Sequence, residues 1–155
     1  MSDRTLSDTY NDFIRAIEGR LGDALVAALG PEVGREATQE ALIYAWEHWE
    51  RVNAMEYPAA YLYKVGRSKA KRYWKKQGRY PEPPADTMPM VEPGLAPAIA
   101  RLSEKQRITV LLVHGFDWTQ AEVADFLGVA VGTVQKHLER GMVRLRTDLE
   151  VDRGT

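Results

Sequence analysis

The sequence predicts an all-α protein built from two small helical domains that are joined by a proline-rich linker. Its 155 residues suffice for two modest cores. Apolar residues recur three and four positions apart with little alternation, which is typical of helices. Six of the eight prolines lie between Tyr80 and Pro97, where neither a helix nor a central strand tolerates them. We therefore expect domains at residues 1–79 and 98–155, with a linker over residues 80–97.

In the first domain, Gly30 and Pro31 separate the first helix from the second, because proline cannot continue a helix but can begin one. Leu42, Trp46 and Trp49 follow a helical period in the second helix, and we expect these three side chains in the core. The segment 51–58 should break this helix from a third one that starts near residue 59.

The third helix is amphipathic and strongly basic. Residues 64–80 contain eight Lys and Arg and no acid, and their apolar arc consists of Leu62, Tyr63, Gly66, Ala70, Tyr73 and Trp74. Like charges at helical spacing repel, so a group outside the helix should neutralise them. A nucleic-acid backbone would do so, and the alternatives are a solvated face or pairing with the acidic helices. The small residues Gly66 and Ala70 argue against a membrane-binding face.

Charge is unevenly distributed along the chain. Residues 1–63 contain 11 acids against 5 bases, residues 81–100 contain three acids and no base, and residues 101–155 balance at eight each. The net charge of the whole chain, -1, is thus the sum of a basic segment and the acidic segments on either side of it. Such asymmetry indicates a polyanionic partner for one segment and another partner for the rest.

The second domain contains two sequence signals for helix starts. Ser103 with Gln106 forms a capping box ahead of an apolar helix over 108–113 that stops at Gly115. A second capping box, Thr119 with Glu122, begins another helix.

A glycine turn follows, and it completes a helix-turn-helix pattern. Gly128 supplies the turn, and a further helix runs from about Val131 with Val134 and Leu138 inward. A helix of about eight residues, a glycine turn and a second helix are typical of DNA-reading units, although any helical hairpin with such a turn imitates part of the pattern. Candidate DNA contacts are Thr119, Thr133, Gln135, Lys136, His137 and Arg140. Glutamine can bond adenine, and Lys or Arg can reach guanine or phosphate. With Glu139 beside Arg140, we expect weak binding by this domain alone.

The sequence gives no support for several classes of functional site. Without cysteine there is no disulfide, thiolate nucleophile or zinc knuckle, and the three histidines are far apart in sequence. No phosphate-binding glycine loop precedes a Lys-Ser or Lys-Thr pair. We expect no catalytic residue, metal, cofactor or small-molecule substrate. The N-terminus lacks a signal peptide and no apolar run approaches about 20 residues, so we expect a cytoplasmic protein without membrane insertion.

Three segments in order resemble a known family. EATQEALIYAWEHWE (36–50), YPAAYLYKVGRSKAKRYWKK (57–76) and the region beginning LSEKQRITVLLVHGFDWTQAEVADFLG (102–128) are similar to regions two and four of bacterial RNA polymerase sigma factors of the extracytoplasmic-function group. The resemblance implies a region two-like first domain and a region four, winged-helix-like second domain.

The resemblance also implies partners and site residues. Core RNA polymerase, through its beta-prime and beta subunits, would contact Glu36, Gln39, Glu40, Ile43 and Glu47. The minus-ten element and the melted strand would contact Arg51, Asn53, Tyr57, Tyr61, Lys64, Arg67, Lys71, Arg72 and Lys75. The first three of these would capture a flipped base, which costs a few kcal/mol to extrude; Asn53 could instead only cap a turn. The minus-thirty-five element would contact the helix-turn-helix candidates.

The implied function is that of a sigma factor, which directs core polymerase to promoters in the bacterial cytoplasm and assists strand opening. Partners would be double- and single-stranded promoter DNA, with an anti-sigma factor also possible in this family. The two promoter elements would be roughly 55–60 Å apart at about 3.4 Å per base pair, which an extended linker of 18 residues could span at about 3.1 Å each. Ala130 replaces a common serine cap, and Gln135 and His137 replace common cations. The alternative is therefore a sigma-like regulator that binds DNA or polymerase without initiating.

Overall fold

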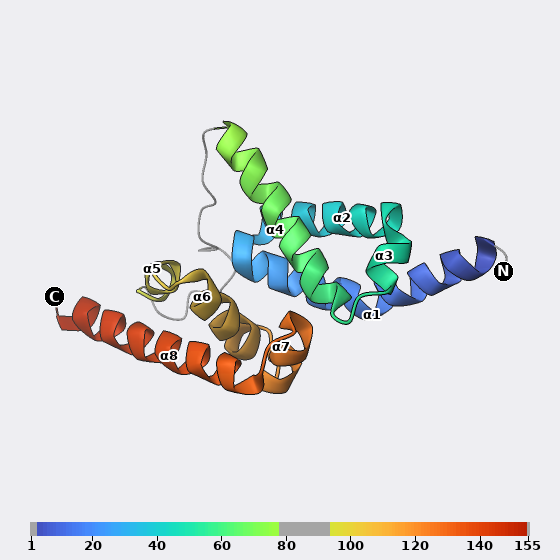
Figure 1. The fold of residues 1–155 in the computed structure, drawn as a ribbon. Coiled ribbons are helices and arrows are strands. Elements are labelled where there is room, and N and C mark those ends of the chain that lie inside the picture. Colours follow the sequence, from blue (N-terminus) through green and yellow to red (C-terminus); the bar gives the residue numbers. More distant parts are fainter. Residues whose placement is uncertain (1–2, 78–93, 155) are drawn as a thin grey trace.

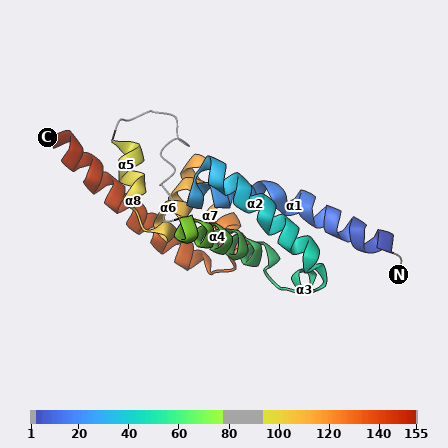
Figure 2. The same cartoon turned by 90° about the horizontal axis from the view of Figure 1, so that it is seen from above.

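The structure is a computed structural model that describes residues 3–77 and 94–154. Within these ranges every regular element is helical, which confirms the predicted fold class (Figures 1 and 2). The elements in order are α1 (Asp3–Leu29), α2 (Pro31–Glu47), α3 (Trp49–Asn53), α4 (Pro58–Gln77), α5 (Leu95–Ala100), α6 (Glu104–Val110), the π-helical turn η2 (Leu111–Gly115), α7 (Gln120–Leu127) and α8 (Val131–Gly154).

Helices α1, α2 and α4 form the N-terminal module, in which each buries one apolar face. Leu21 and Leu25 of α1 and Leu62 of α4 are fully buried at its centre. The close crossing of α1 and α2 requires Gly34, because a Cβ there would lie 2.5 Å from the Cα of Val26. The small residue therefore sets how closely these helices approach.

The predicted break at Gly30 and Pro31 is confirmed. Gly30 has φ 90° and Pro31 opens α2. The predicted break over 51–58 is wrong in its first part, because Trp49–Asn53 forms the short helix α3 before the chain turns into α4. Val52 is buried and anchors this short helix.

The expected core position of Trp46 is wrong. Trp49 is buried, with 6% of its surface exposed, whereas Trp46 is 53% exposed. Since α2 ends at Glu47, the turn into α3 directs Trp49 inward and leaves Trp46 at the rim, where it packs edge-on against Tyr10 at 4.8 Å between ring centroids. Leu42 is partly buried against the core, as expected.

The C-terminal module forms as its capping signals predict. The Ser103 hydroxyl accepts a hydrogen bond of 3.2 Å from the Gln106 amide, and the Thr119 hydroxyl accepts one of 3.0 Å from the Glu122 amide. Gly128 ends α7 in the left-handed conformation. Val134 is buried on α8 with Leu138 partly buried, which confirms the helix-turn-helix geometry.

The C-terminal boundary of the predicted linker can be compared with the structure. Helix α5 begins at Leu95, inside the segment 80–97, and Pro97 lies in its first turn, where a missing N–H costs little. The apolar arc of α4 is buried at Leu62, Tyr63, Gly66 and Ala70. The side chains of Tyr73 and Trp74 and residues 78–93 of the linker lie outside the described part of the chain.

The two modules pack directly against each other, α1 on α6 and η2, and α4 on α7 (Figure 1). The buried Trp118 indole donates a 3.2 Å hydrogen bond to the Asp23 carboxylate of α1. Arg20 lies 5.5 Å from the Trp118 ring centroid and pairs with Glu122 at 2.6 Å. No helix within the described ranges is long and apolar enough to cross a membrane.

Candidate nucleic-acid interface

The cationic surface of α4 is partly neutralised by the other module. Arg67 and Lys71 donate hydrogen bonds of 3.2 and 3.3 Å to the Glu104 carboxylate, which lies in the first turn of α6. Within the described residues, one acid of the C-terminal domain thus neutralises two of these cations. Lys64 and Arg72 are exposed; the side chain of Lys75 lies outside the described part.

Tyr63 lies beneath this surface. Its side chain is buried, and among the described residues no group meets hydrogen-bond geometry with its hydroxyl. Arg67 covers the ring at 5.5 Å from its centroid. Burial raises the pKa of the Tyr63 hydroxyl, and the Glu104 carboxylate raises it further, so the phenol stays protonated at neutral pH.

A cluster of aromatic and cationic side chains joins α2, α3 and α4, and we call it the Arg51 cluster (Tyr44, His48, Arg51, Tyr61, Lys69). The Arg51 guanidinium donates hydrogen bonds to the hydroxyls of Tyr44 and Tyr61, which lie 3.0 Å from each other. The His48 ring stacks on Tyr44 at 4.2 Å, and the Lys69 ammonium lies 5.7 Å from the same ring. Flat rings and fixed cations are the groups that bind unpaired bases.

Sequence reasoning found Arg51 and Tyr61 of this cluster but missed Tyr44, His48 and Lys69. A signal was present, because Tyr44, His48 and Arg51 follow one another at spacings of four and three, which places them on one side of a helix. Lys69 was counted in the basic helix without a role. Its position over the Tyr44 ring depends on how α4 packs against α2.

The loop before α4 reaches the helix-turn-helix. Asn53 ends α3 with an exposed side chain, and Tyr57 is 45% exposed just before α4. Gly128, at φ 67°, lies under the Tyr57 ring so closely that a Cβ there would be 2.9 Å from the ring carbon Cγ. The structure therefore places a predicted base-binding residue on the turn of the DNA-reading motif.

The predicted helix-turn-helix contacts divide into two groups. Gln135, Lys136 and Arg140 are exposed on α8, whereas Thr119 uses its hydroxyl in the α7 cap. His137 is half-buried. Loss of solvation lowers its pKa, and the neighbouring cations Lys105 and Arg140 lower it further.

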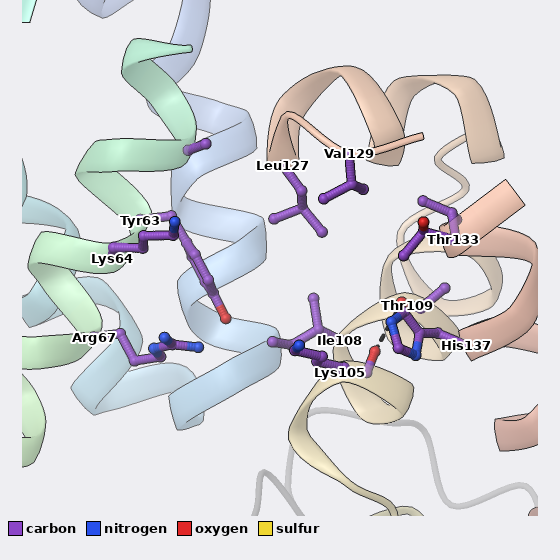
Figure 3. Close-up of a pocket in the computed structure, with 12 residues that line it drawn as sticks. Tyr63, Lys64, Arg67, Lys105, Ile108, Thr109, Leu127, Val129, Thr133 and His137 are labelled. Carbon is purple, nitrogen blue, oxygen red and sulfur yellow. Dashed lines mark hydrogen bonds between the residues drawn. The ribbon is translucent and has the colours of Figure 1, made fainter. Parts of the chain in front are cut away.

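Thr133 and His137 face α4 across a pocket of about 320 Å³, which we call the intermodule pocket (Figure 3). Lys64 and Arg67 of α4 line the opposite wall. Predicted contacts for two different promoter elements are thus brought together at one place. Among the described residues, no group of three or more His, Asp or Glu side chains could hold a metal.

Helix α2 presents a different surface, which we call the α2 docking face (Glu36, Gln39, Glu40, Ile43, Trp46, Glu47). All six residues are exposed, and Ile43 is 57% exposed. Sequence reasoning missed Trp46 because it was assigned to the core. Two large apolar side chains among carboxylates are typical of a surface that a protein partner covers.

Comparisons with known proteins agree with this geometry. Residues 35–80 match the family Sigma-70 region 2, and residues 95–145 match Sigma-70, region 4. An RNA polymerase sigma-E factor of Streptomyces antibioticus is 30% identical over 131 residues, which span 77% of this chain and 72% of the relative. The ECF RNA polymerase sigma factor SigL of Mycobacterium tuberculosis is 29% identical over 130 residues, spanning 74% and 73%.

A solved structure shows the same fold. The sigma factor RpoE of Bartonella quintana, in complex with the anti-sigma factor NepR, aligns with a TM-score of 0.60 at 19% identity, over 93% of this chain and 98% of that one. The sequence matches identify the family of the chain, and the structural match supports its fold. The chain belongs to the sigma-70 family of RNA polymerase sigma factors, in the extracytoplasmic-function group.

Proposed function

We propose that three surfaces of this chain divide the work of a sigma factor, which directs core RNA polymerase to promoters and assists strand opening. The α2 docking face binds core polymerase. The Arg51 cluster and the cations of α4 bind the minus-ten element. The exposed side chains Gln135, Lys136 and Arg140 of α8 bind the minus-thirty-five element. The observation that supports this division is that an acidic, partly apolar face of α2 and a cationic, aromatic cluster that joins α2 to α3 and α4 belong to one small module.

The α2 docking face suits a basic protein partner. Ile43 and Trp46 offer apolar area that gains from burial, at about 25 cal/mol per Å². The surrounding Glu36, Glu40 and Glu47 steer a cationic surface toward them. These carboxylates also repel DNA, so the polymerase and promoter contacts should not compete for this helix.

The Arg51 cluster is prepared to receive an unpaired base. Its hydrogen bonds hold the rings of Tyr44 and Tyr61 in place before any ligand arrives. A flipped base loses a few kcal/mol of stacking and pairing, which a rigid aromatic site recovers in part. Asn53 at the end of α3 and Tyr57 just before α4 are exposed and would add contacts to the same strand, and the α4 cations would hold the adjoining phosphates.

The two promoter-binding surfaces cannot both be used in the arrangement of the free chain. Lys64 and Thr133 line the same pocket, whereas the elements they would contact are about 55–60 Å apart on B-DNA. We therefore expect the modules to separate when polymerase docks. The free chain should bind promoter duplex weakly.

Run-off transcription tests the proposal. Core polymerase, the full-length chain and bacterial promoter fragments should yield transcripts with start sites that depend on the chain. Ile43→Ser should reduce core binding at least tenfold and abolish these transcripts, because it removes an exposed apolar contact. Val143→Ser is the matched control, since Val143 is 55% exposed on α8, outside the proposed surfaces.

A wild-type chain that fails to bind core polymerase would contradict the proposal. The closed arrangement and the missing hydroxyl at Ala130 also favour a second candidate, a regulator that binds without initiating. That candidate predicts transcripts only when another sigma factor is added.

A further inference from the structure

The intermodule pocket has an apolar wall that both modules supply. Ala60 of α4, Ile108 of α6 and Val134 of α8 line it. Leu127 and Val129 lie side by side near the α7–α8 turn (Figure 3). A cavity lined in this way favours the apolar body of a ligand over water. Because α4 belongs to one module and the other helices to the second, the pocket exists only while the modules are packed together.

The remaining wall contains cations of both modules. Lys64, Arg67, Lys105 and His137 line it, and no carboxylate does. In the described part of the chain, Arg67 pairs with Glu104, whereas Lys64 and Lys105 have no salt bridge. Lys105 is close enough to His137 to lower the pKa of that imidazole. Lys64 and Lys105, which line one space without a salt bridge among the described residues, favour an anion there.

We propose that the intermodule pocket binds a small amphipathic anion, with its apolar body against Ile108, Leu127 and Val129 and a carboxylate or phosphate head group at Lys64 and Lys105. The volume of about 320 Å³ lies at the lower end of small-molecule sites and is too confined for a protein helix. The ligand would contact both modules at once.

Occupancy would hold the modules closed, a consequence that rests on the proposed function. The ligand would fill the space between Lys64 and Arg67 on one side and Thr133 and His137 on the other, which are predicted contacts for the two promoter elements. A ligand that binds only the packed arrangement shifts the population toward it. Promoter binding should weaken as the ligand concentration rises.

Calorimetry with the full-length chain tests the site. The probes are decanoate and octyl phosphate, which share the proposed chemistry but differ in head group, with decanol and decylammonium as neutral and cationic counterparts, all below their micelle concentrations. At least one anionic probe should bind at a single saturable site, tenfold or more tightly than decanol. Tighter binding of decanoate or of octyl phosphate then shows whether the natural ligand has a carboxylate or a phosphate head group. Equal binding of decanol and the anions, or no anion binding, would overturn the proposal.

Variants distinguish binding in the pocket from binding of the anion elsewhere on the chain. Lys105→Gln removes a head-group cation, and Val129→Trp fills the mouth of the pocket from a partly exposed position. Each should reduce binding of the preferred anion at least tenfold. Arg144→Gln is the matched control, because Arg144 is an exposed cation of α8 that does not line the pocket. Thermal unfolding checks that each variant folds.

The effect of the anion on promoter binding is measured in a separate experiment. The preferred anion should weaken binding of a fluorescent promoter duplex to the wild-type chain and leave Lys105→Gln largely unaffected. An anion that binds in the pocket without changing promoter affinity would overturn the regulatory step. A chain that binds the anion but never supports transcription with core polymerase would instead overturn the proposed function.

Discussion

Glu104 of α6 accepts a 3.2 Å hydrogen bond from Arg67 of α4, so an acid of the C-terminal module neutralises a cation of the predicted minus-ten surface. The same carboxylate accepts a hydrogen bond from Lys71. Two predicted phosphate contacts are thereby occupied in the free chain. Both pairs are partly exposed, and such pairs contribute about 0–1 kcal/mol each to stability.

Glu104→Gln should raise the affinity of the free chain for duplex DNA several-fold. The two released cations should also increase the magnitude of the slope of log K against the logarithm of the salt concentration by about 2, since each phosphate contact adds roughly 0.9 to it. Fluorescence anisotropy over a salt series measures both quantities. Glu150→Gln changes the charge equally at an exposed position near the end of α8. Identical salt slopes for the two variants would show that Glu104 does not restrain these cations.

Gly128→Ala should destabilise the chain by about 1–2 kcal/mol from the left-handed backbone alone. The new Cβ would also meet the Tyr57 ring at 2.9 Å, which adds to the cost. In the background of Tyr57→Ala the second contribution should disappear and the first should remain. Denaturant unfolding of the double-mutant cycle measures the difference.

Gly132→Ala is the matched control for this cycle. A Cβ at Gly132 meets no atom within 4 Å, and the residue lies in the first turn of α8. Alanine should therefore be neutral or stabilising there, by up to about 1 kcal/mol. Equal effects of Gly128→Ala with and without Tyr57→Ala would contradict the contact between the loop and the turn.

Tyr63→Phe should leave stability unchanged or raise it by about 1 kcal/mol. The buried Tyr63 hydroxyl has no hydrogen-bond partner among the described residues, and an unsatisfied buried polar group costs about 1–3 kcal/mol. Phenylalanine keeps the ring that packs edge-on against Phe126 at 6.5 Å. Thermal unfolding of both proteins tests this expectation; a loss of more than 1 kcal/mol would mean that the hydroxyl has a stabilising partner.

Acidification should weaken the folded chain through His137. Its pKa in the fold lies below the ordinary 6.5, because burial and then the cations Lys105 and Arg140 disfavour the charged ring. The unfolded chain thus binds more protons in this range, so the contribution of His137 is present above about pH 6.5 and is lost as the pH falls through the lowered pKa. Lys64 and Arg67 are the charged groups that line the opposite side of the pocket.

Unfolding measured between pH 5 and 8 tests this dependence. His137→Gln should flatten the slope below pH 6.5. An unaltered slope in His137→Gln would assign the pH dependence to other groups.

Sequence reasoning succeeded where the controlling interactions are local. The capping boxes at Ser103 and Thr119 and the left-handed Gly128 involve residues within a few positions of each other, and the structure has all three. The order of helices and the helix-turn-helix followed from such signals.

Sequence reasoning failed where packing between distant segments determines which side chains are buried and which are in contact. Trp46 and Trp49 have the same spacing signal, but the turn between α2 and α3 buries only one of them. The pairing of Glu104 with Arg67 spans 37 positions, and the stacking of Lys69 over Tyr44 depends on how α4 crosses α2. No periodicity or motif encodes these contacts, because they arise from tertiary geometry.

The central claim is that the promoter-binding surfaces of the two modules face each other in the free chain and separate in the productive complex. The chain contains no cysteine, so Ser68→Cys in α4 and Arg144→Cys in α8 would give one pair of labelling sites at exposed positions. Electron paramagnetic resonance distance measurement on the spin-labelled chain tests the claim most directly. The account predicts one narrow distance in the free chain and a longer one with core polymerase and promoter DNA. A distance that stays the same in a transcribing complex would contradict it.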